Sequence, residues 1–398
     1  MGDALPQTPP TRRKSRDLFV QGALPRYVWR VMRTSARSVT SIRAVGIAAQ
    51  FALALGVACA EAHAQCTADI DQNAQVGGSD LTILLSAWGT SGQGTFNSDL
   101  NNDGIVGGSD LTILLSAWGP CAPTVPDWAT LIEALPDPAV VPDAALRSQI
   151  IATGLAWRVR DAQTLIEMLL IPPGFYQRGC SASLASACNG DENPRHTVTL
   201  TNAFYLGRYE VTQAQWVSVI GSNPSAFQGD AYPDAADRPV EQIGWDASMP
   251  FFKITGMRMP TEAEWEYAFR AGTGSAFHGT ANFPAGTDDD ARLPEIAWFA
   301  GNNGASGSSS YGTKRVGLKA GNGFGLHDMA GNVFEWVNDW WGTYEPNAQV
   351  DPTGPLTGSF RVLRGGNWLM GAANCRASAR YLTLFPSSIV GIRAARNP

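Results

Sequence analysis

The chain has 398 residues, of which 44% are hydrophobic and 16% are charged, so it is long enough for two or three domains and too apolar to be disordered throughout. Its formal charge is −6, and its basic residues are enriched before residue 65. The chain after residue 64 has a net negative charge, which excludes nucleic-acid binding through a basic face.

Residues 1–64 are typical of a signal peptide. An apolar run at 44–60 follows several arginines, and residues 62–64 (AHA) have the small-x-small pattern of a cleavage site. A membrane anchor is the alternative, but the run is short for a span. We expect a mature chain that begins near Gln65 and lacks a membrane span, with Met1 or Met32 as the start, exported to an extracellular, periplasmic or cell-surface location.

Five cysteines remain after this leader, and an oxidising compartment would join them in pairs. Cys66 and Cys121 bracket one segment, and Cys180 and Cys188 bracket a short loop. We therefore predict disulfides Cys66–Cys121 and Cys180–Cys188, with Cys375 left as a free thiol.

Residues 76–89 recur unchanged at 106–119, which indicates a duplicated unit in residues 65–121. Each copy ends a twelve-residue loop rich in oxygen-bearing side chains, the donors that a calcium ion prefers. The second loop has Gly104 at its turn, whereas the first has Ala74, so we expect weaker binding in the first. The candidate metal ligands are Asp69, Asp71, Asn73 and Asp80 in the first loop, and Asp99, Asn101, Asp103 and Asp110 in the second.

Each loop is followed by apolar residues at helical spacing: Leu81, Leu84, Leu85 and Trp88, and then Leu111, Leu114, Leu115 and Trp118. These residues form an apolar stripe along one face of each predicted helix. A single helix cannot bury its own stripe, so the two helices should pack on each other. The pair resembles the type I dockerin module, which implies structural calcium and a cohesin-like or cell-surface protein partner. The alternative is that the pair packs within its own chain.

Residues 122–155 contain many prolines and predict a linker. Residues 156–398 combine short strand-like runs with glycine-rich loops, and predict an irregular α+β fold. The strand-like runs are 157–160, 166–171, 196–201, 204–208 and 361–364. Two capping boxes, Thr212 with Gln215 and Thr261 with Glu264, each predict a helix start.

Several motifs of the C-terminal part, in the same order, are similar to the sulfatase-modifying-factor family, whose founding activity is the formylglycine-generating enzyme. They are IEMLLIPPGFYQRG (166–179), ENPRHTVTL (192–200), FYLGRYEVTQAQW (204–216), MRMPTEAEWEYAFRAG (257–272), GFGLHDMAGNVFEWVNDWW (323–341), RVLRGGNW (361–368) and GIRAA (391–395). The resemblance implies a C-type-lectin-like α+β fold with little regular secondary structure and with calcium inside.

The resemblance also implies a copper site, but this chain departs from it. Formylglycine-generating enzymes oxidise a protein cysteine with O₂ at a copper ion held by two cysteines, since soft thiolates suit Cu(I). The corresponding positions here are Met370 and Cys375. Cys375 is therefore a packed structural thiol, or part of a mixed copper site with Met370, or next to a groove with other chemistry.

The family's calcium loop corresponds to HDMAGNVFEW (327–336), which implies the Asp328 side chain, the Gly331 and Val333 carbonyls and Glu335 as ligands. An acidic surface turn is the alternative. Arg258, Arg376 and Arg393 are expected to pair with buried carboxylates.

Two functions follow from the sequence. The first is a calcium-stabilised binding or assembly module that lacks the two-cysteine copper site. The alternative is an oxidoreductase that converts a protein cysteine to formylglycine, or oxidises another protein thiol, through Cys375.

Overall fold

A computed structural model describes residues 66–71, 75–184, 188–308, 310–383 and 385–398. The predicted signal peptide, both start residues, and Asn73 and Ala74 of the first loop lie outside these ranges. Within the described ranges, no helix has the length and apolarity needed to cross a bilayer. The repeat pair and the C-terminal domain are described separately below.

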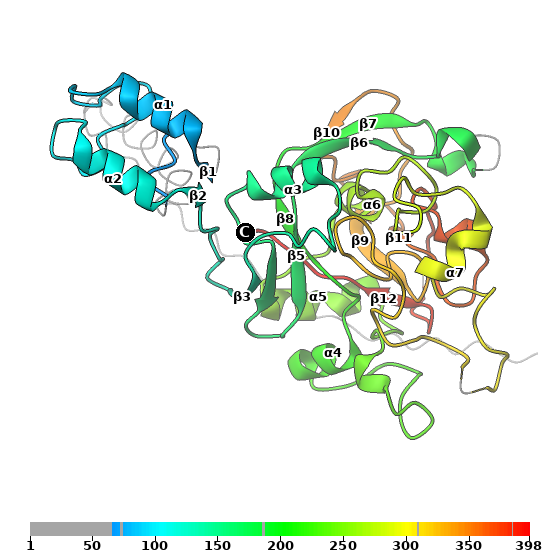
Figure 1. Ribbon diagram of the computed structural model, residues 1–398. Coiled ribbons are helices and arrows are strands. Elements are labelled where there is room, and N and C mark those ends of the chain that lie inside the picture. The colour runs from blue at the N-terminus through cyan, green and yellow to red at the C-terminus, as the bar shows by residue number, and fades with distance from the viewer. Residues whose placement is uncertain (1–65, 72–74, 185–187, 309, 384) are drawn as a thin grey trace, which may run out of the picture. The chain divides into compact units, whose positions relative to one another are not determined.

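The repeat pair consists of two loop–helix units whose ends meet. Helix α1 (Gly78–Ser86) packs against α2 (Gly108–Ser116), and the short strands β1 (Gln75–Val76) and β2 (Gly119–Pro120) pair antiparallel (Figure 1). Leu84 and Leu114 are fully buried in the shared core. The predicted packing of the two helices is thus confirmed, and the Cys66–Cys121 disulfide joins the ends of the module as expected.

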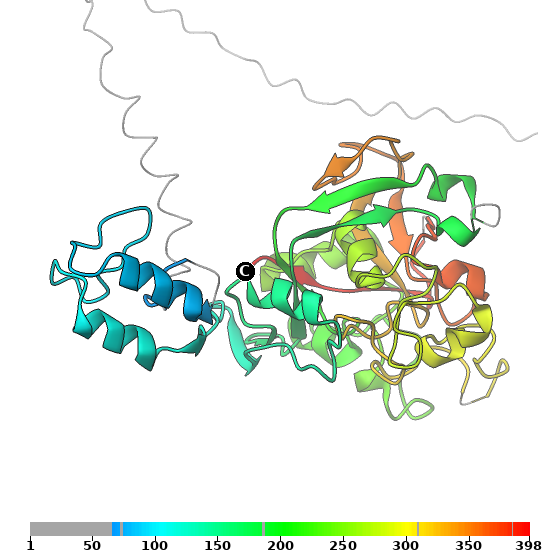
Figure 2. The ribbon, with the colours of Figure 1, turned by 45° about the horizontal axis from the view of Figure 1, so that its top comes forward.

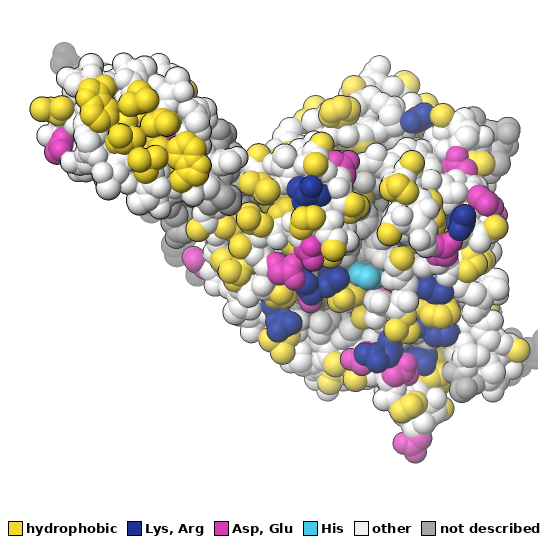
Figure 3. Space-filling view, in the orientation of Figure 1, with side chains coloured by type: hydrophobic (Ala, Val, Ile, Leu, Met, Phe, Trp, Pro, Cys, Tyr) yellow, Lys and Arg dark blue, Asp and Glu magenta, His cyan; other side chains and the backbone are white. Residues whose placement is uncertain are grey.

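One residue of each predicted apolar stripe, Leu84 or Leu114, is buried, and Leu81 and Leu111 are partly buried. Leu85 and Trp88 are 50% and 47% exposed, and Leu115 and Trp118 are 53% and 51% exposed. Figure 3 shows hydrophobic side chains gathered on one face of this module. We call these four residues the Leu/Trp face. The stripe is wider than the contact between the two helices, so its outer edge remains exposed.

The C-terminal domain contains a five-stranded antiparallel sheet with the order β13-β8-β5-β4-β3. Its strands are β3 (Ala129–Glu133), β4 (Arg158–Asp161), β5 (Glu167–Ile171), β8 (Phe204–Gly207) and β13 (Ala395–Arg396). Strand β3 and helix α3 (Ala144–Ile151) come from the segment predicted to be a linker. Val141, Leu146 and Ile150 of that segment are buried in the main core, so the ordered domain begins before residue 156.

Two three-stranded sheets complete the domain, with the orders β10-β7-β6 and β11-β9-β12. Figure 2 shows β10 beside the β6–β7 hairpin. The strands are β6 (Gly174–Arg178), β7 (His196–Leu200), β9 (Phe334–Trp340), β10 (Gln349–Val350), β11 (Arg361–Arg364) and β12 (Val390–Ile392). The helices are α4 (Gln213–Ile220), α5 (Trp245–Thr255), α6 (Glu262–Arg270) and α7 (Leu293–Ile296), and short 3₁₀ turns include Ala372–Cys375.

Local sequence signals placed these elements well. Each strand-like run contains a strand, and Thr212 and Thr261 are the N-caps of α4 and α6, each accepting a hydrogen bond from the backbone N–H three residues on. The Cys180–Cys188 disulfide is also present, and Cys375 is free.

Helix α6 is buried along almost its whole length, including the charged residues Glu262, Glu266 and Arg270, and contacts β6, β7, β9 and β11. Glu262 pairs with Arg178 at 2.6 Å and with Arg380 at 2.7 Å. Glu266 pairs with Arg270 and with Arg364 of β11. A buried charge is tolerated only when it is paired, so these contacts fix where the strands meet α6.

Candidate functional site

The segment after β11 carries the two sulfur-bearing residues that the copper hypothesis names. Gly366 has φ +77°, and a Cβ atom there would lie 2.6 Å from Cys375 Sγ and 2.8 Å from the Asn374 carbonyl oxygen. Only glycine permits this approach, because both the backbone angle and the space exclude a side chain. The RGG motif therefore packs its backbone directly against the thiol.

Cys375 is a fully buried thiol. Its exposed fraction is 0%, and burial raises its pKa to about 12, although backbone hydrogen bonds at Asn367 and Gly331 act to lower it. A thiol with this pKa is protonated at neutral pH, whereas the thiolate is the metal ligand and the nucleophile.

Met370 lies in a different environment from Cys375. Its side chain is partly buried against the core, and its backbone carbonyl accepts a hydrogen bond from the Ala300 N–H at 3.0 Å. The backbone N–H of Met370 donates to Asn367 Oδ1 at 3.1 Å. Because Cys375 has no exposed surface, an ion in an open groove would not reach its sulfur in this conformation.

The predicted calcium loop does bring carboxylates together. Asp328 is 1% exposed, and its Oδ2 accepts the Gly317 N–H at 2.6 Å. Its Oδ1 is buried without a hydrogen-bond partner among the described residues. Burial and the neighbouring Glu335 raise the pKa of Asp328 to about 6, against the lowering effects of the Gly317 hydrogen bond and Arg393. An unpartnered buried oxygen is the kind of donor that a hard cation satisfies.

Glu335, in contrast, is fully engaged by other residues. Arg393 Nη2 lies 2.6 Å from Oε1, Arg393 Nε lies 3.0 Å from both oxygens, and Trp265 Nε1 donates to Oε2 at 2.6 Å. Three N–H donors thus serve the two oxygens, with the Arg393 Nε–H shared between them, and the guanidinium balances the charge of the carboxylate. The four-ligand set implied by the resemblance therefore does not fit calcium here, because Glu335 is held by Arg393.

The expected arginine pairs are all present. Arg258 pairs with Glu264 at 2.6 Å, Arg376 with Glu192, and Arg393 with Glu335. In the Arg393–Glu335 pair, the arginine occupies the carboxylate that the resemblance assigns to calcium.

Glu210 is a member of this cluster that the sequence analysis missed. Its Oε2 accepts Asn332 Nδ2 at 2.6 Å, and its Oε1 accepts the Val333 N–H at 3.1 Å. Burial and the charges of Asp328 and Glu335 raise its pKa well above the usual value. No local sequence pattern marks Glu210 as a site residue, because its hydrogen-bond partners lie more than a hundred residues away along the chain.

In the second repeat loop, Asp99 and Asp110 organise the backbone. Asp99 accepts the N–H groups of Asp103 and Gly104, and Gly104 has φ +91° at the predicted turn. Burial opposes ionisation of Asp110, but backbone hydrogen bonds from Gly107, Asn101 and Leu100 lower the pKa of its carboxyl group. The side chains of Asn101 and Asp103 are exposed. These oxygens fit a calcium ion, since those of Asp99 each keep a lone pair.

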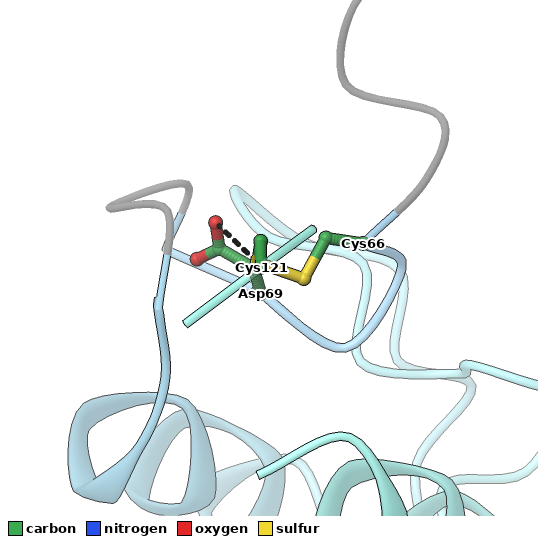
Figure 4. Close-up of side chains that lie close together, drawn as sticks. All are labelled: Cys66, Asp69 and Cys121. Atoms are coloured by element: carbon green, nitrogen blue, oxygen red, sulfur yellow. Dashed lines mark hydrogen bonds between the residues drawn. A yellow bond between two sulfur atoms is a disulfide. The ribbon is translucent and has the colours of Figure 1, made fainter. Parts of the chain in front are cut away.

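In the first loop, Asp69, Asp71 and Asp80 each offer a carboxylate oxygen within 4.8 Å of the others. Asn73 lies outside the described residues. Figure 4 shows Asp69 beside the Cys66–Cys121 disulfide, with Oδ2 3.6 Å from Cys121 Sγ. These sulfurs are not metal ligands, because they are bonded to each other and cannot become thiolates.

The C-terminal part of the chain is an α+β domain with three sheets, in which the Gly366 backbone packs against the Cys375 thiol. The family described as "Sulfatase-modifying factor enzyme 1-like domain" matches residues 157–398, more than half of the chain. The chain belongs to this family.

Known relatives carry different names. The chain is 34% identical over 197 residues to a "Formylglycine-generating enzyme" of Thermomonospora curvata, an alignment that covers 46% of this chain and 64% of that protein. It is 30% identical to "Serine/threonine-protein kinase pkn1" of Chlamydia pneumoniae, covering 58% and 38%. The chain thus spans less than two thirds of either relative. Among solved structures, "Treponema denticola variable protein 1" aligns with a TM-score of 0.50 and 29% identity, covering 58% of this chain and 95% of that one. Because relatives in this family are named for different activities, family membership does not determine the activity of this chain.

Proposed function

We propose that this chain is an exported, calcium-stabilised binding or assembly module whose sulfatase-modifying-factor domain does not oxidise thiols with copper. The proposal rests on the environment of Cys375. Its thiol is fully buried, and burial raises its pKa to about 12. The position where the resemblance implies the second copper-binding cysteine holds Met370. The two disulfides support export, because such bonds persist in oxidising compartments.

The chemistry of copper explains why one substitution matters. Two thiolates hold Cu(I) and leave a position for a substrate thiol, whereas a thioether is a neutral and weaker donor. A protonated, buried Cys375 would also have to lose its proton and become accessible before it could bind the ion.

The alternative is an oxidoreductase that acts on a protein thiol through Cys375, with Met370 as a second soft ligand. The relative named "Formylglycine-generating enzyme" supports this alternative. The two functions differ in a measurable way, because only the second requires Cys375 to bind copper.

The test is a Cu(I) titration of the purified chain against a chromogenic chelator, together with an assay for aldehyde formation on a cysteine-containing peptide. We expect the chain and its Cys375→Ala variant to bind Cu(I) equally weakly and to form no aldehyde. The Met370→Cys variant provides the comparison, since it replaces the thioether with the second thiol that a two-thiolate copper site requires. Aldehyde formation by the unaltered chain, dependent on copper and lost in Cys375→Ala, would reject the proposal.

We propose that calcium binds the repeat loops, through Asp99, Asn101, Asp103 and Asp110 in the second loop and through Asp69, Asp71, Asn73 and Asp80 in the first. Calcium titrations of the Asp110→Ala and Asp80→Ala variants test this. The two variants are matched, because both carboxylates make equivalent backbone hydrogen bonds at the start of their helices. We expect Asp110→Ala to abolish the tighter site and Asp80→Ala the weaker one. Two sites of equal affinity would contradict the assignment.

For the C-terminal domain, we propose that Asp328, together with the carbonyls of Gly331 and Val333, takes part in a third calcium site. The unpartnered Oδ1 of Asp328 supports this, and Glu210 offers the second carboxylate in place of Glu335. Calcium-dependent stabilisation that persists in Asp80→Ala/Asp110→Ala and disappears on adding Asp328→Asn is the expected result.

We further propose that the Leu/Trp face docks a partner, either a cohesin-like or cell-surface protein or a surface of its own chain. Four exposed leucine and tryptophan side chains on two adjacent helices support this, because large apolar patches mark interaction sites. A Trp88→Ser/Trp118→Ser variant should lose retention on the cell surface while keeping its calcium affinity. Unchanged retention would exclude the face.

A further inference from the structure

A cavity of about 1010 Å³ lies in the C-terminal domain, on the side of the loops that follow α6. Its walls come from segments far apart in the sequence: residues 139–146, 271–285 and 320–327, with Arg208 from the end of β8. Neither Cys375 nor Met370 is among the described residues that line it. Its volume is at the upper end of the range for small-molecule sites, about 300 to 1,000 Å³.

One glycine in the cavity wall has room for a side chain. Gly274 lines the cavity, and nothing lies within 4 Å of where its Cβ atom would be. Its φ is not in the left-handed region, so its own backbone would accept a side chain. The neighbouring Gly272 differs, because its φ of +87° favours glycine on conformational grounds.

Two polar groups on this wall point to the chemistry of a ligand. His327 Nδ1 lies 2.8 Å from the Lys319 carbonyl oxygen, which can only accept, so this nitrogen carries the proton. Nε2 of the neutral ring is therefore an acceptor. It lies 3.5 Å from Arg208 Nη2, a donor at the limit of hydrogen-bond distance. A ligand hydroxyl group could donate to His327 Nε2 and accept from Arg208 Nη2. Both hydrogen bonds could then be shorter than the 3.5 Å contact between these two atoms.

Charges around the cavity disfavour an ionic ligand. Arg208 pairs with Glu167 at 2.6 Å, and Glu167 also pairs with Arg158. Arg158 has a second carboxylate partner, Glu133, so two arginines face two carboxylates and the cluster is neutral as a whole. Asp143 and the lone pair of His327 Nε2 would repel an anion. Figure 3 shows a surface histidine beside Lys and Arg side chains with acidic side chains close by, rather than a field of one sign.

The remaining wall suits the carbon skeleton of such a ligand. Val140, Pro142, Leu146 and Pro284 line it with apolar surface. The Thr280 hydroxyl accepts the Asn282 N–H, and its own proton has no acceptor among the described residues. Apolar walls with a few donors and acceptors in fixed positions are typical of sites for neutral organic molecules.

We propose that this cavity binds a neutral, hydroxyl-rich small molecule of the size of a mono- or disaccharide, with one hydroxyl group donating to His327 Nε2 and accepting from Arg208 Nη2. The cavity lining includes neither the two sulfur-bearing residues nor the repeat loops, and His327 lies directly before Asp328 of the calcium site proposed in the same domain.

The experiment is saturation-transfer difference NMR on the full chain with a panel of neutral ligands: glucose, galactose, mannose, N-acetylglucosamine, maltose, cellobiose and sorbitol. Glucuronate and glucosamine serve as charged comparators. Dissociation constants follow by titration for each ligand that binds. Three variants are compared with the unaltered chain: Gly274→Trp, which fills the opening, His327→Phe, which removes the acceptor but keeps a ring, and Gly371→Trp as the control. Gly371 also has nothing within 4 Å of a Cβ atom and lies outside the cavity lining.

At least one neutral ligand should bind, and Gly274→Trp and His327→Phe should each weaken it by about tenfold or more, with Gly371→Trp unchanged. Melting temperatures show whether a variant is folded, and loss of binding counts only in a folded variant. If His327→Phe is unfolded, Gly274→Trp decides alone, since a Cβ atom there meets no heavy atom within 4 Å. The proposal is overturned if no neutral ligand binds, if glucuronate or glucosamine binds more tightly, or if Gly371→Trp rather than Gly274→Trp abolishes binding.

Discussion

Asp339 is a buried carboxyl group, and replacing it with asparagine should change how the stability of the domain depends on pH. The residue lies in β9, is 1% exposed, and accepts the Glu262 N–H through Oδ2 at 2.8 Å. Its Oδ1 has no partner among the described residues. Burial, followed by the negative charge of Glu262, raises the pKa of Asp339 to about 7.

The sign follows from the two protonation equilibria. The unfolded chain releases this proton near its ordinary pKa of 3.8, whereas the folded chain keeps it up to about pH 7. The stabilisation is therefore fully present below about pH 4 and is lost as the pH rises through 7. A shift of about three pKa units corresponds to about 4 kcal/mol, of which about 3 kcal/mol falls between pH 5 and pH 8.

The assay is urea unfolding followed by tryptophan fluorescence at pH 5 and pH 8, at fixed calcium concentration. Asp339→Asn keeps an oxygen for the Glu262 N–H and removes the ionisable proton. From pH 5 to pH 8, the unaltered chain should lose about 3 kcal/mol more unfolding free energy than this variant.

Asp127→Asn is the control, because it removes one negative charge from an exposed position. It should follow the unaltered chain at both pH values. If the Asp339→Asn variant also follows the unaltered chain from pH 5 to pH 8, Asp339 is ionised in the folded state and the reasoning fails.

Three further predictions concern the packing and burial of individual side chains. Gly366→Ala should lower the unfolding free energy by about 2 to 4 kcal/mol in urea titrations, because the new methyl group meets Cys375 Sγ at a left-handed φ; a neutral effect would mean that the segment relaxes. In the repeat pair, Leu84→Ala should cost about 2 to 5 kcal/mol and Leu85→Ala about 0.5 kcal/mol or less, and equal losses would contradict the buried and exposed assignments. Burial lowers the pKa of His278 to about 4, so folding stability should fall as the pH drops from 6.5 to 4, by about 3 kcal/mol, and His278→Phe should abolish that part of the acid sensitivity.

Features that depend on neighbouring residues could be predicted from the sequence. The duplicated loops, the helix caps at Thr212 and Thr261 and the strand-like runs all rest on spacing within about a dozen residues. The disulfides were also predictable, because cysteines that bracket a segment leave few pairings.

The tertiary structure alone decided which candidate groups are free to act. Arg393 lies 58 residues from Glu335 along the chain, and its contact removes Glu335 from the expected calcium ligands. Glu210 joins Asp328 across an even longer separation, and the backbone of Gly366 buries Cys375. The linker segment entered the sheet as β3 because its partner strand supplies hydrogen bonds that no local pattern reveals.

The sequence by itself thus determined the family motifs, the local elements and the identity of each donor atom. Only the folded chain determined which donors are buried, paired or exposed, including the outer half of each Leu/Trp stripe and the cavity beside Arg208 and His327. The physical reason is that the pKa and availability of a group depend on neighbours brought close by folding, which a single sequence does not specify.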